Sequence, residues 1–456
     1  MNAPGTPSIK TLHLTNYYHR HSGGISTSFN NLMDAAERRE RHVRLIVPGE
    51  RDAVDDVNPF AKIYFIKARP SPFFDKRYRI LLPWQYMPSG SLIREIMLAE
   101  MPDIVEVTDK YTLSMIGAMV RLNKFSQLGR PILVHFSCER MDDNVGSFIS
   151  RGKAGKWLSS RVVGNYLLPS FDYHIANSSY TADEFYESVR STARKGPRSL
   201  FSRSWRIFGA PRVPLSERVF VCPRGVNTQH YRPDRRSEPV RRRILEAAGF
   251  PDTSVVLLYA GRLSPEKNVG LLIGIIRELA NGSDHDFRLI IAGDGPERER
   301  LENEGKKLGD NRFFFAGHLD SEALAEHYAN VDVFIHPNPK EPFGIAPLEA
   351  MASGVPTVAP RSGGILSYAS DDNAWLVDGT VDGFVESIRA ILHDESETQR
   401  RTENALKTAI DNSREAATDR LFDTYDRIYK DFYARKEMFA GVEKAKRFDY
   451  TEVINV

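Results

Sequence analysis

Two glutamates flank a short glycine turn in the second half of the chain, where together they could hold a hydroxyl-rich ligand. Glu341 and Glu349 stand eight positions apart, with Phe343 and Gly344 between them. Pro347 suits the first turn of a helix, because its missing N–H would have no partner there. The pattern predicts a loop carboxylate and a helical carboxylate beside a helix N-terminus, which favours phosphate and sugar oxygens.

These two carboxylates have two interpretations. Their separation allows one of them to bind a sugar hydroxyl and the other a ribose hydroxyl. The alternative is that Glu341 is a solvated loop residue and that Glu349 caps neighbouring N–H groups of its helix.

Two cations follow an earlier predicted strand, Val255–Tyr259. Arg262 and Lys267 lie in the loop Tyr259–Asn268, which ends that strand and opens a helix. Cations at the carboxyl end of a strand can neutralise a diphosphate leaving group. The alternative is a surface pair that solvates the loop.

Glycine turns follow two other predicted strands. Gly293, Asp294 and Gly295 come between a strand and a helix, where the glycines allow a ligand to approach the backbone; a plain tight turn is the alternative. Gly23 and Gly24 follow the first strand and let the backbone approach a phosphate or an acceptor. The full GxGxxG of a dinucleotide site is lacking, which disfavours a nicotinamide dehydrogenase.

A histidine, His135, ends the predicted strand Ile132–His135. It is either a residue close to the ligand or a hydrogen-bonded core histidine, and the residue types alone leave both open.

Length and composition favour a two-domain globular protein. The chain has 456 residues, 41% hydrophobic and 27% charged, and its net charge of +2 gives no strong overall field for nucleic acid. Cys138 and Cys222 lack the spacing of zinc ligands, which fits a reduced, cytoplasmic compartment. Met1–Lys10 lacks the layout of a signal peptide and no run of about 18 apolar residues occurs, so we expect a soluble protein or one at a membrane surface.

Short apolar runs alternate with helical patterns in both halves, which predicts two parallel sheets covered by helices. The predicted strands of the first half are Thr11–Leu14, His42–Val47, Ile63–Ile66, Ile104–Val107, Ile132–His135 and Tyr173–Ala176. Those of the second half are Val255–Tyr259, Phe287–Ala292, Phe313–Ala316, Val333–His336 and Pro356–Ala359. We therefore expect an α/β fold with two doubly wound, Rossmann-like domains facing across a cleft.

The expected domains follow from a proline cluster and a final helical pattern. We expect residues 1–213 to form an N-terminal Rossmann-like domain, and residues 214–410 to form a C-terminal one that carries both glutamates and both cations. Residues 411–456 form a C-terminal helix that crosses back to the first domain, followed by a tail.

The two-glutamate segment resembles the E-x7-E signature of the family 4 retaining glycosyltransferases, which have the GT-B fold. The resemblance extends through His336-Pro337 before it and Ser353-Gly354-Val355-Pro356 after it, and covers nearly all of Val219–Ser387. Arg262 and Lys267 match the family pattern G-R-x-x-x-x-K residue by residue.

The resemblance implies a role for each motif. The residues implied in catalysis are His135, Arg262, Lys267 and Glu341. The residues implied in donor binding are Gly23, Gly24, Gly293, Asp294, Gly295, His318, Leu319, Phe343, Gly344, Ile345 and Glu349. Within this set, Glu349 would hold the ribose, Glu341 the sugar hydroxyls, and the backbone near His318 the base. The chain departs from the family at Phe136, where an acidic residue usually follows the histidine.

A basic segment, Arg190–Arg218, contains Phe201, Trp205, Ile207 and Phe208 among its cations. Such a surface suits an anionic lipid leaflet, and the alternative is a solvated insertion loop. Binding of nucleic acid is not expected, since no DNA or RNA module accompanies the segment.

The predicted function is transfer of a hexose from a nucleoside diphosphate sugar, of the GDP-mannose or UDP-glucose type, to a hydroxyl of a saccharide, glycolipid or lipid-linked acceptor. We expect retention at the anomeric carbon, no cofactor besides the donor substrate, and no metal, because no DxD-type cluster follows a strand. The expected location is cytoplasmic and peripheral at the inner face of the membrane. A non-catalytic nucleotide-sugar-binding protein is the alternative; a sucrose-synthase-like enzyme and a GT-B epimerase fit the length and the motifs less well.

Overall fold

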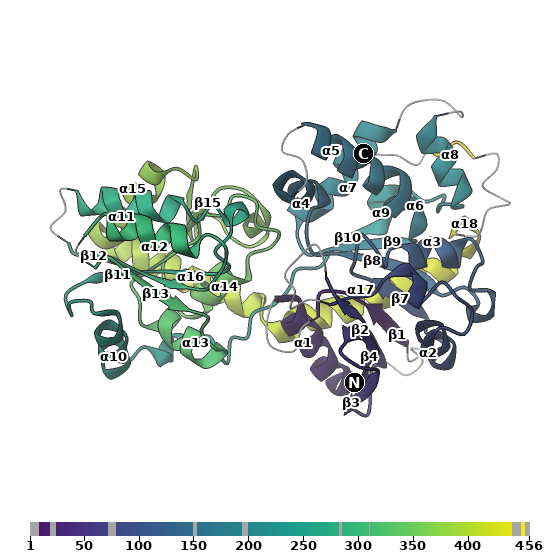
Figure 1. Cartoon of the computed structure of the whole chain (residues 1–456), viewed down its shortest axis with the longest axis horizontal. Helices are drawn as coiled ribbons and strands as arrows, with labels where there is room; N and C mark the ends of the chain where they lie inside the picture. Colours follow the sequence, from purple (N-terminus) through teal and green to yellow (C-terminus); the bar gives the residue numbers. More distant parts are fainter. Residues whose placement is uncertain are drawn as a thin grey trace. The chain divides into compact units, whose positions relative to one another are not determined.

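The computed structural model describes residues 9–18, 24–71, 79–148, 153–193, 199–281, 285–309, 311–439 and 448–451. It divides into two compact units, which differ in colour in Figure 1. Unit 1 comprises Met1–Pro223 and Ala417–Val456, and unit 2 comprises Arg224–Ala416. The two boundaries fall ten and six residues after the positions expected from the sequence, 214 and 411.

Unit 1 is built on an eight-stranded sheet with the order β10-β9-β8-β7-β1-β2-β4-β3. Its strands are β1 (Thr11–Leu14), β2 (Val43–Gly49), β3 (Ala53–Asn58), β4 (Ala61–Lys67), β7 (Ile104–Val107), β8 (Ile132–Ser137), β9 (Tyr173–Ala176) and β10 (Val219–Val221). All pairs are parallel except β3 with β4. A separate ladder joins β5 (Arg69–Pro70) and β6 (Arg79–Ile80).

Two helices, α1 (Gly24–Arg38) and α17 (Arg414–Ala434), cover one face of this sheet. Helix α17 is held to the sheet by a polar contact as well as by apolar packing. The Tyr425 hydroxyl donates to Glu106 Oε2 at 2.6 Å inside the core. The remaining helical segments are η1 (Pro83–Gln85), α2 (Leu92–Glu100), α3 (Met115–Arg121), η2 (Ser126–Leu128), α4 (Met141–Phe148), α5 (Lys153–Val162), η3 (Val163–Leu167), α6 (Leu168–Ser170), α7 (Ser179–Thr192), α8 (Leu200–Ile207), α9 (Leu215–Arg218) and α18 (Lys436–Phe439). Of these, α2, α3, α4, α7 and α8 contribute to the core on the other face.

Unit 2 has a six-stranded parallel sheet with the order β13-β12-β11-β14-β15-β16. Its strands are β11 (Val255–Ala260), β12 (Phe287–Ala292), β13 (Phe313–Gly317), β14 (Val333–Ile335), β15 (Thr357–Pro360) and β16 (Trp375–Val377). In chain order this is 3-2-1-4-5-6, the doubly wound arrangement. The direction of winding reverses between β11 and β14, so the loops after these two strands flank the switch point.

Helices cover both faces of the second sheet (Figure 1). One face packs against α11 (Leu271–Ala280), α12 (Arg298–Lys306) and α15 (Val381–His393). The other packs against α10 (Glu238–Ala248), α13 (Ser321–Ala329), α14 (Ile345–Ala352) and α16 (Glu395–Asp411). Short 3-10 turns complete the unit: η4 (Pro233–Arg235), η5 (Pro265–Lys267) and η6 (Gly364–Ser367).

The expected strands lie where the sequence places them, within two residues at each end. The strands β3, β10 and β16 were not expected. β3 is exposed along almost its whole length and therefore has no apolar alternation to reveal it, and β10 and β16 have only three residues each.

The basic segment differs from the expectation of exposed aromatics. Phe201 and Trp205 are fully buried, since α8 turns them into the core, where Trp205 packs against Tyr450 with a ring-centroid distance of 5.5 Å. Arg218 is fully buried as well, and its Nη1 donates to the carbonyl oxygens of Phe171 and Asp172. Arg194, Lys195 and Arg198 lie outside the described residues.

Candidate functional site

The loops that flank the switch point of unit 2 carry the predicted carboxylate and the predicted cations. Lys267 ends η5 in the loop after β11, and Glu341 lies in the loop after β14. Lys267 Nζ donates to Glu341 Oε2 at 2.8 Å, so an ion pair joins the two loops at the point where ligands bind in such sheets.

Glu341 is held by three groups that share one of its oxygens. Besides Lys267, Asn338 Nδ2 donates to Oε2 at 2.8 Å, and His336 Nε2 lies 3.4 Å from the same oxygen. Burial opposes ionisation, but the charge of Lys267 and the nearby His336 outweigh it and hold the pKa of Glu341 well below its usual value. The side chain is therefore a fixed carboxylate at neutral pH.

Glu349 has the opposite environment although it stands in the same segment. It lies one turn into α14, where the Tyr328 hydroxyl donates to its Oε2 at 3.1 Å. Burial raises the pKa of Glu349 to about 7, against the lowering effect of hydrogen bonds from Tyr328 and Tyr231. This carboxyl group is therefore poised to change its charge near neutral pH.

The turn between the two glutamates brings backbone rather than side chains to the site. Gly344 is the N-cap of α14 with φ +90°, and a Cβ there would lie 2.8 Å from the Tyr368 hydroxyl, which donates to the Gly344 carbonyl oxygen. Phe343 is buried and packs edge-to-face on Tyr368, so its side chain belongs to the core. Ile345, the first residue of α14, is half-buried.

The other cation of the pair, Arg262, is exposed in the loop after β11. Its carbonyl oxygen accepts a hydrogen bond from the buried Tyr259 at 3.0 Å, which fixes the backbone of the loop while the guanidinium extends outward. Arg262 and Lys267 thus lie on the same switch-point loop, one exposed and the other paired with Glu341.

The glycine turn after β12 packs against its neighbouring loop. Gly293 has φ +144°, and a Cβ there would lie 1.9 Å from the carbonyl oxygen of Gly261. At Gly295 a Cβ would lie 2.3 Å from the carbonyl oxygen of Leu263. These glycines are required for close contact between loops, which is the tight-turn alternative of the sequence interpretation.

Two further residues that the resemblance implies in donor binding, Asp294 and His318, are exposed at the ends of neighbouring strands. Asp294 accepts a hydrogen bond from the Gly295 N–H at 2.7 Å and lies 3.5 Å from Arg298 Nη1. His318 follows β13, and Leu319 beside it packs against the core. The backbone of this turn faces the same carboxyl edge, because Gly293 N donates to Gly317 O at 2.7 Å.

In unit 1, His135 does not lie at the edge of the sheet. It is fully buried in β8, with its ring 5.5 Å from Phe171, 5.7 Å from His174 and 5.9 Å from Phe185. Burial, followed by the charges of His174 and Lys110, lowers the pKa of His135 well below its usual value. This position is that of a core histidine, and it does not support the contact with the donor sugar that the resemblance implied.

The carboxyl edge of the first sheet has its own polar bridge across a switch point, between β1 and β7. Asn16 Nδ2 donates to Asp109 Oδ2 at 3.0 Å. Beside it, the Tyr17 hydroxyl donates to Glu139 Oε1 at 3.2 Å, and burial raises the pKa of Glu139. Gly24 begins α1, and Gly23 lies outside the described residues.

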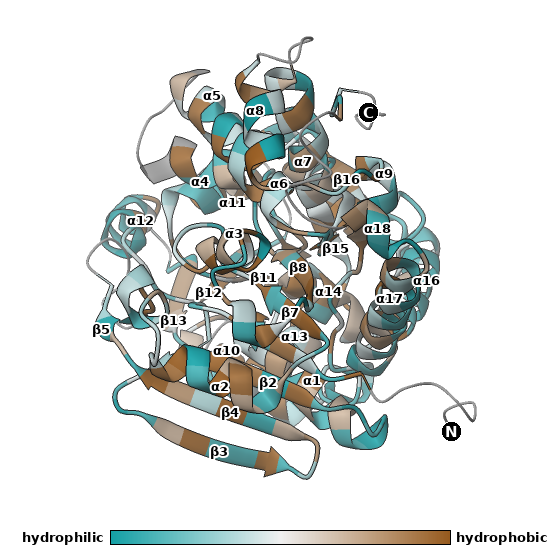
Figure 2. Cartoon of the chain, turned by 90° about the vertical axis from the view of Figure 1, so that its right-hand side faces the viewer, coloured by the Kyte–Doolittle hydropathy of each residue, from teal (hydrophilic) through white to brown (hydrophobic). Residues whose placement is uncertain are grey.

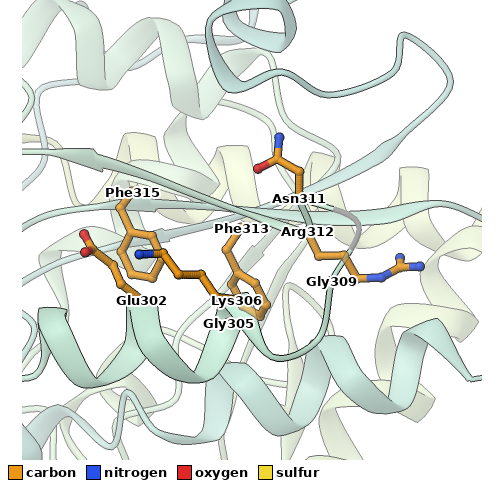
Figure 3. Close-up of a pocket in the computed structure, with 8 residues that line it drawn as sticks. All are labelled: Glu302, Gly305, Lys306, Gly309, Asn311, Arg312, Phe313 and Phe315. Atoms are coloured by element: carbon orange, nitrogen blue, oxygen red, sulfur yellow. The ribbon is translucent and has the colours of Figure 1, made fainter.

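A cavity of about 400 Å³ lies on the edge strand of the second sheet (Figure 3). Phe313 and Phe315 from β13 line it together with Glu302 and Lys306 from α12. It contains none of the predicted site residues.

Sequence reasoning missed the residues that position the two glutamates. Tyr328 and Asn338 contact Glu349 and Glu341, respectively, and Tyr231 acts on Glu349 from the start of unit 2. Asn338 lies within three residues of Glu341 and could have been suspected from its place in the motif. Tyr231 and Tyr328 carry no local signal, because only the fold brings them to α14.

Part of the chain matches a known protein family. Residues 240–408 match the family described as glycosyl transferases group 1. The chain is 26% identical over 397 residues to the GDP-mannose-dependent alpha-(1-6)-phosphatidylinositol dimannoside mannosyltransferase of Mycobacterium tuberculosis, covering 86% of this chain and 90% of that protein. It is also 32% identical over 211 residues to a GDP-mannose-dependent alpha-mannosyltransferase of Mycobacterium tuberculosis, covering 46% of this chain and 52% of that protein.

Solved structures show the same fold at low identity. HepE of Anabaena, in complex with UDP and glucose, is 19% identical with a TM-score of 0.64 over 92% of this chain and 100% of that chain. Sucrose-phosphate synthase from Thermosynechococcus elongatus is 17% identical with a TM-score of 0.66 over 92% of this chain and 100% of that chain.

Two Rossmann-like units, one with a switch-point site of two carboxylates and two cations, have the GT-B fold of these solved structures. The match of residues 240–408 to the glycosyl transferases group 1 confirms the resemblance seen in the sequence. Within the described part of the chain, no helix is long and apolar enough to cross a membrane.

The contact between loops at Gly293 gives a first prediction. Gly293→Ala forces a Cβ against the carbonyl oxygen of Gly261, and we expect unit 2 to lose about 3 kcal/mol of unfolding free energy in urea titrations. Gly309→Ala is the matched control, because Gly309 has φ +68° but nothing within 4 Å of its added Cβ, and it should lose only about 1 kcal/mol. Equal losses in the two variants would contradict the role of the loop contact.

Proposed function

We propose that the chain is a retaining, metal-independent hexosyltransferase that uses a nucleoside diphosphate sugar. The observation that carries the proposal is the ion pair of Lys267 with Glu341 across the switch point, beside Glu349 on α14. A group that leaves as a diphosphate needs cations and N–H donors where its charge develops. Arg262, Lys267 and the N-terminus of α14 supply both at this edge of the sheet.

The two glutamates divide the recognition of the donor. Glu349 accepts hydrogen bonds from the ribose hydroxyls, and Glu341 accepts one from a hydroxyl of the transferred sugar. Lys267 has three donors, so it can keep Glu341 and still reach the diphosphate. The bond between the anomeric carbon and the diphosphate oxygen breaks, the acceptor hydroxyl attacks from the same face, and its proton passes to the leaving phosphate. This retains the anomeric configuration and needs no protein nucleophile.

GDP-mannose is the first donor to test, and UDP-glucose is the second. Two relatives are named as GDP-mannose-dependent mannosyltransferases, and HepE was solved with UDP and glucose. One relative acts on a phosphatidylinositol dimannoside, which favours a lipid-linked or glycolipid acceptor bound by unit 1. We further propose a cytoplasmic enzyme at the inner face of the membrane, with Arg190–Arg218 in its contact surface.

Release of nucleotide from a panel of donor sugars tests this function. The purified chain with a glycolipid acceptor should release GDP or UDP, and an excess of chelator should leave the rate unchanged, because protein cations carry the charge of the leaving group. A chain that binds nucleotide but releases none with any acceptor is the non-catalytic binding protein. Complete loss of activity with chelator contradicts metal independence.

The division of roles between the glutamates gives a separate prediction. Glu349→Ala should weaken nucleotide binding by about 10- to 100-fold, the effect of losing hydrogen bonds to a charged acceptor. Glu341→Ala should reduce kcat far more than nucleotide affinity, because the nucleotide itself does not contact this residue. Calorimetry and steady-state kinetics measure the two effects. An equal loss of kcat and affinity in Glu341→Ala would contradict the division.

The raised pKa of Glu349 predicts a pH dependence of nucleotide binding. At about pH 6 the side chain is mostly protonated, whereas a ribose diol binds the ionised carboxylate; affinity should therefore increase through about pH 7 and level off above it. Glu349→Gln is the control, since it lacks this titration while the phosphate of the nucleotide still ionises near pH 6. Parallel pH profiles for the two proteins would exclude Glu349 as the group that titrates.

A further inference from the structure

Two helices of unit 1, α5 and α8, expose large apolar side chains. Trp157 and Leu158 on α5 are 60% and 47% exposed, and Leu200 and Ile207 on α8 are both 59% exposed. Both helices lie at the same end of unit 1, at the top of Figures 1 and 2. Single exposed apolar residues are common on soluble proteins, but four on two connected helices form a patch that calls for a partner.

Helix α8 has one side that is exposed and partly apolar and another side that is buried in the core. Leu200, Arg203 and Ile207 recur at spacings of three and four residues, which places them on one side of the helix. The other side buries Phe201 and Trp205 in the core. Leu200 and Ile207 therefore lie on the side of the helix that does not pack against that core.

A buried hydrogen bond ties the two helices into one surface. Helix α5 continues directly into η3, and Trp205 Nε1 of α8 donates to the carbonyl oxygen of Gly164 in η3 at 2.8 Å. Trp157 lies two turns before Gly164, about 10 Å along the helix axis. We call the surface formed by Trp157, Leu158, Leu200 and Ile207 the α5–α8 face.

The α5–α8 face is basic. Neither helix contains an acidic residue, and the cations whose side chains the structure describes are Lys156, Arg161, Arg203 and Arg206. Of the acidic residues close by, Glu187 already pairs with Arg140 at 2.8 Å and with Lys156 at 3.3 Å. Asp142 of α4 pairs with Arg140 at 2.9 Å and also interacts with Lys156. Asp449 accepts hydrogen bonds from the N–H and hydroxyl of Thr451 and interacts with Arg206.

We propose that the α5–α8 face docks on an anionic lipid bilayer. Tryptophan favours the boundary between headgroups and acyl chains, leucine and isoleucine favour the acyl side, and cations are attracted to anionic headgroups. A second copy of the chain fits less well, because a two-fold contact would place the cations of one copy against those of the other. This inference refines the membrane contact proposed above. Phe201 and Trp205 of Arg190–Arg218 are buried, so we assign the contact to the exposed side chains of the α5–α8 face instead.

Co-sedimentation with vesicles tests the proposal on the full chain. We expect binding to vesicles of phosphatidylcholine with phosphatidylglycerol at low salt, and little binding to phosphatidylcholine alone. Arg203→Ala should weaken binding by about fivefold, the contribution of one cation near an anionic surface. Trp157→Ser and the double variant Leu200→Ser/Ile207→Ser should weaken it further, also at high salt, because their contribution is apolar.

Matched controls separate the face from the rest of the surface. Trp84→Ser removes a tryptophan that is 65% exposed on η1, and Arg242→Ala removes an arginine that is 57% exposed on α10. Both variants should bind vesicles like the wild type. Equal losses in the controls and in the α5–α8 variants would overturn the proposal, as would the absence of binding to anionic vesicles.

Measuring nucleotide binding distinguishes a failure of this proposal from a failure of the proposed function. The α5–α8 variants should keep the thermal shift that nucleotide produces, because none of their residues lies in unit 2. Vesicle binding lost with the nucleotide response intact supports docking. A different outcome would be that the wild-type chain does not bind anionic vesicles but self-associates, and that the same variants no longer self-associate. The partner of the α5–α8 face would then be a second copy of the chain rather than a bilayer.

Discussion

The ion pair between Lys267 and Glu341 is the interaction on which the site depends. It joins the loops after β11 and β14, the two strands between which the winding of the sheet reverses. Both groups are largely withdrawn from water, with side-chain exposures of 27% and 14%, so removal of either leaves the other as a poorly solvated charge. The two glutamates also differ in their electrostatics. Glu341 has a cation beside it and stays ionised, whereas burial raises the pKa of Glu349 to about 7 because the hydrogen bonds from its tyrosines only partly offset that burial.

Rigid backbone contacts support this pair. The loops after β11, β12 and β13 are bonded in series, since Gly261 N donates to Ala292 O and Gly293 N donates to Gly317 O. The loop that carries Glu341 is bonded in the same way to the loop after β15, through Gly364 N and Glu341 O at 2.6 Å. These backbone hydrogen bonds couple neighbouring loops at the edge of the sheet to one another. Donors and charges held in place before a ligand arrives need no reorganisation during the reaction, which is how a preorganised site lowers a barrier.

The sequence predicts the parts of the structure that local pattern determines. Strands such as Val255–Ala260 are apolar throughout because helices cover both their faces, and this run is visible without a fold. The exposed edge strand β3 has no such signal. At the site, motif spacing identifies Glu341 and Glu349, but the partners that set their charge come from distant elements. His135 shows the limit of the method: a strand buried on both faces does not reveal whether a polar residue near its end points to the edge or into the core.

The side chains described at the carboxyl edges of the two sheets differ in charge. In unit 2 the bridge across the switch point contains a cation, and Arg262 adds a second one. In unit 1 the corresponding bridge joins an amide to a carboxylate, Asn16 to Asp109, and the nearby Lys110 is neutralised by a buried pair with Glu184. Among the described residues, an exposed cation, Arg262, lies beside the bridge in unit 2, while the described residues at the edge of unit 1 present hydroxyl, amide and carboxylate groups. Such groups bind sugar hydroxyls better than phosphates, which supports the proposal that the donor binds unit 2 and the acceptor unit 1.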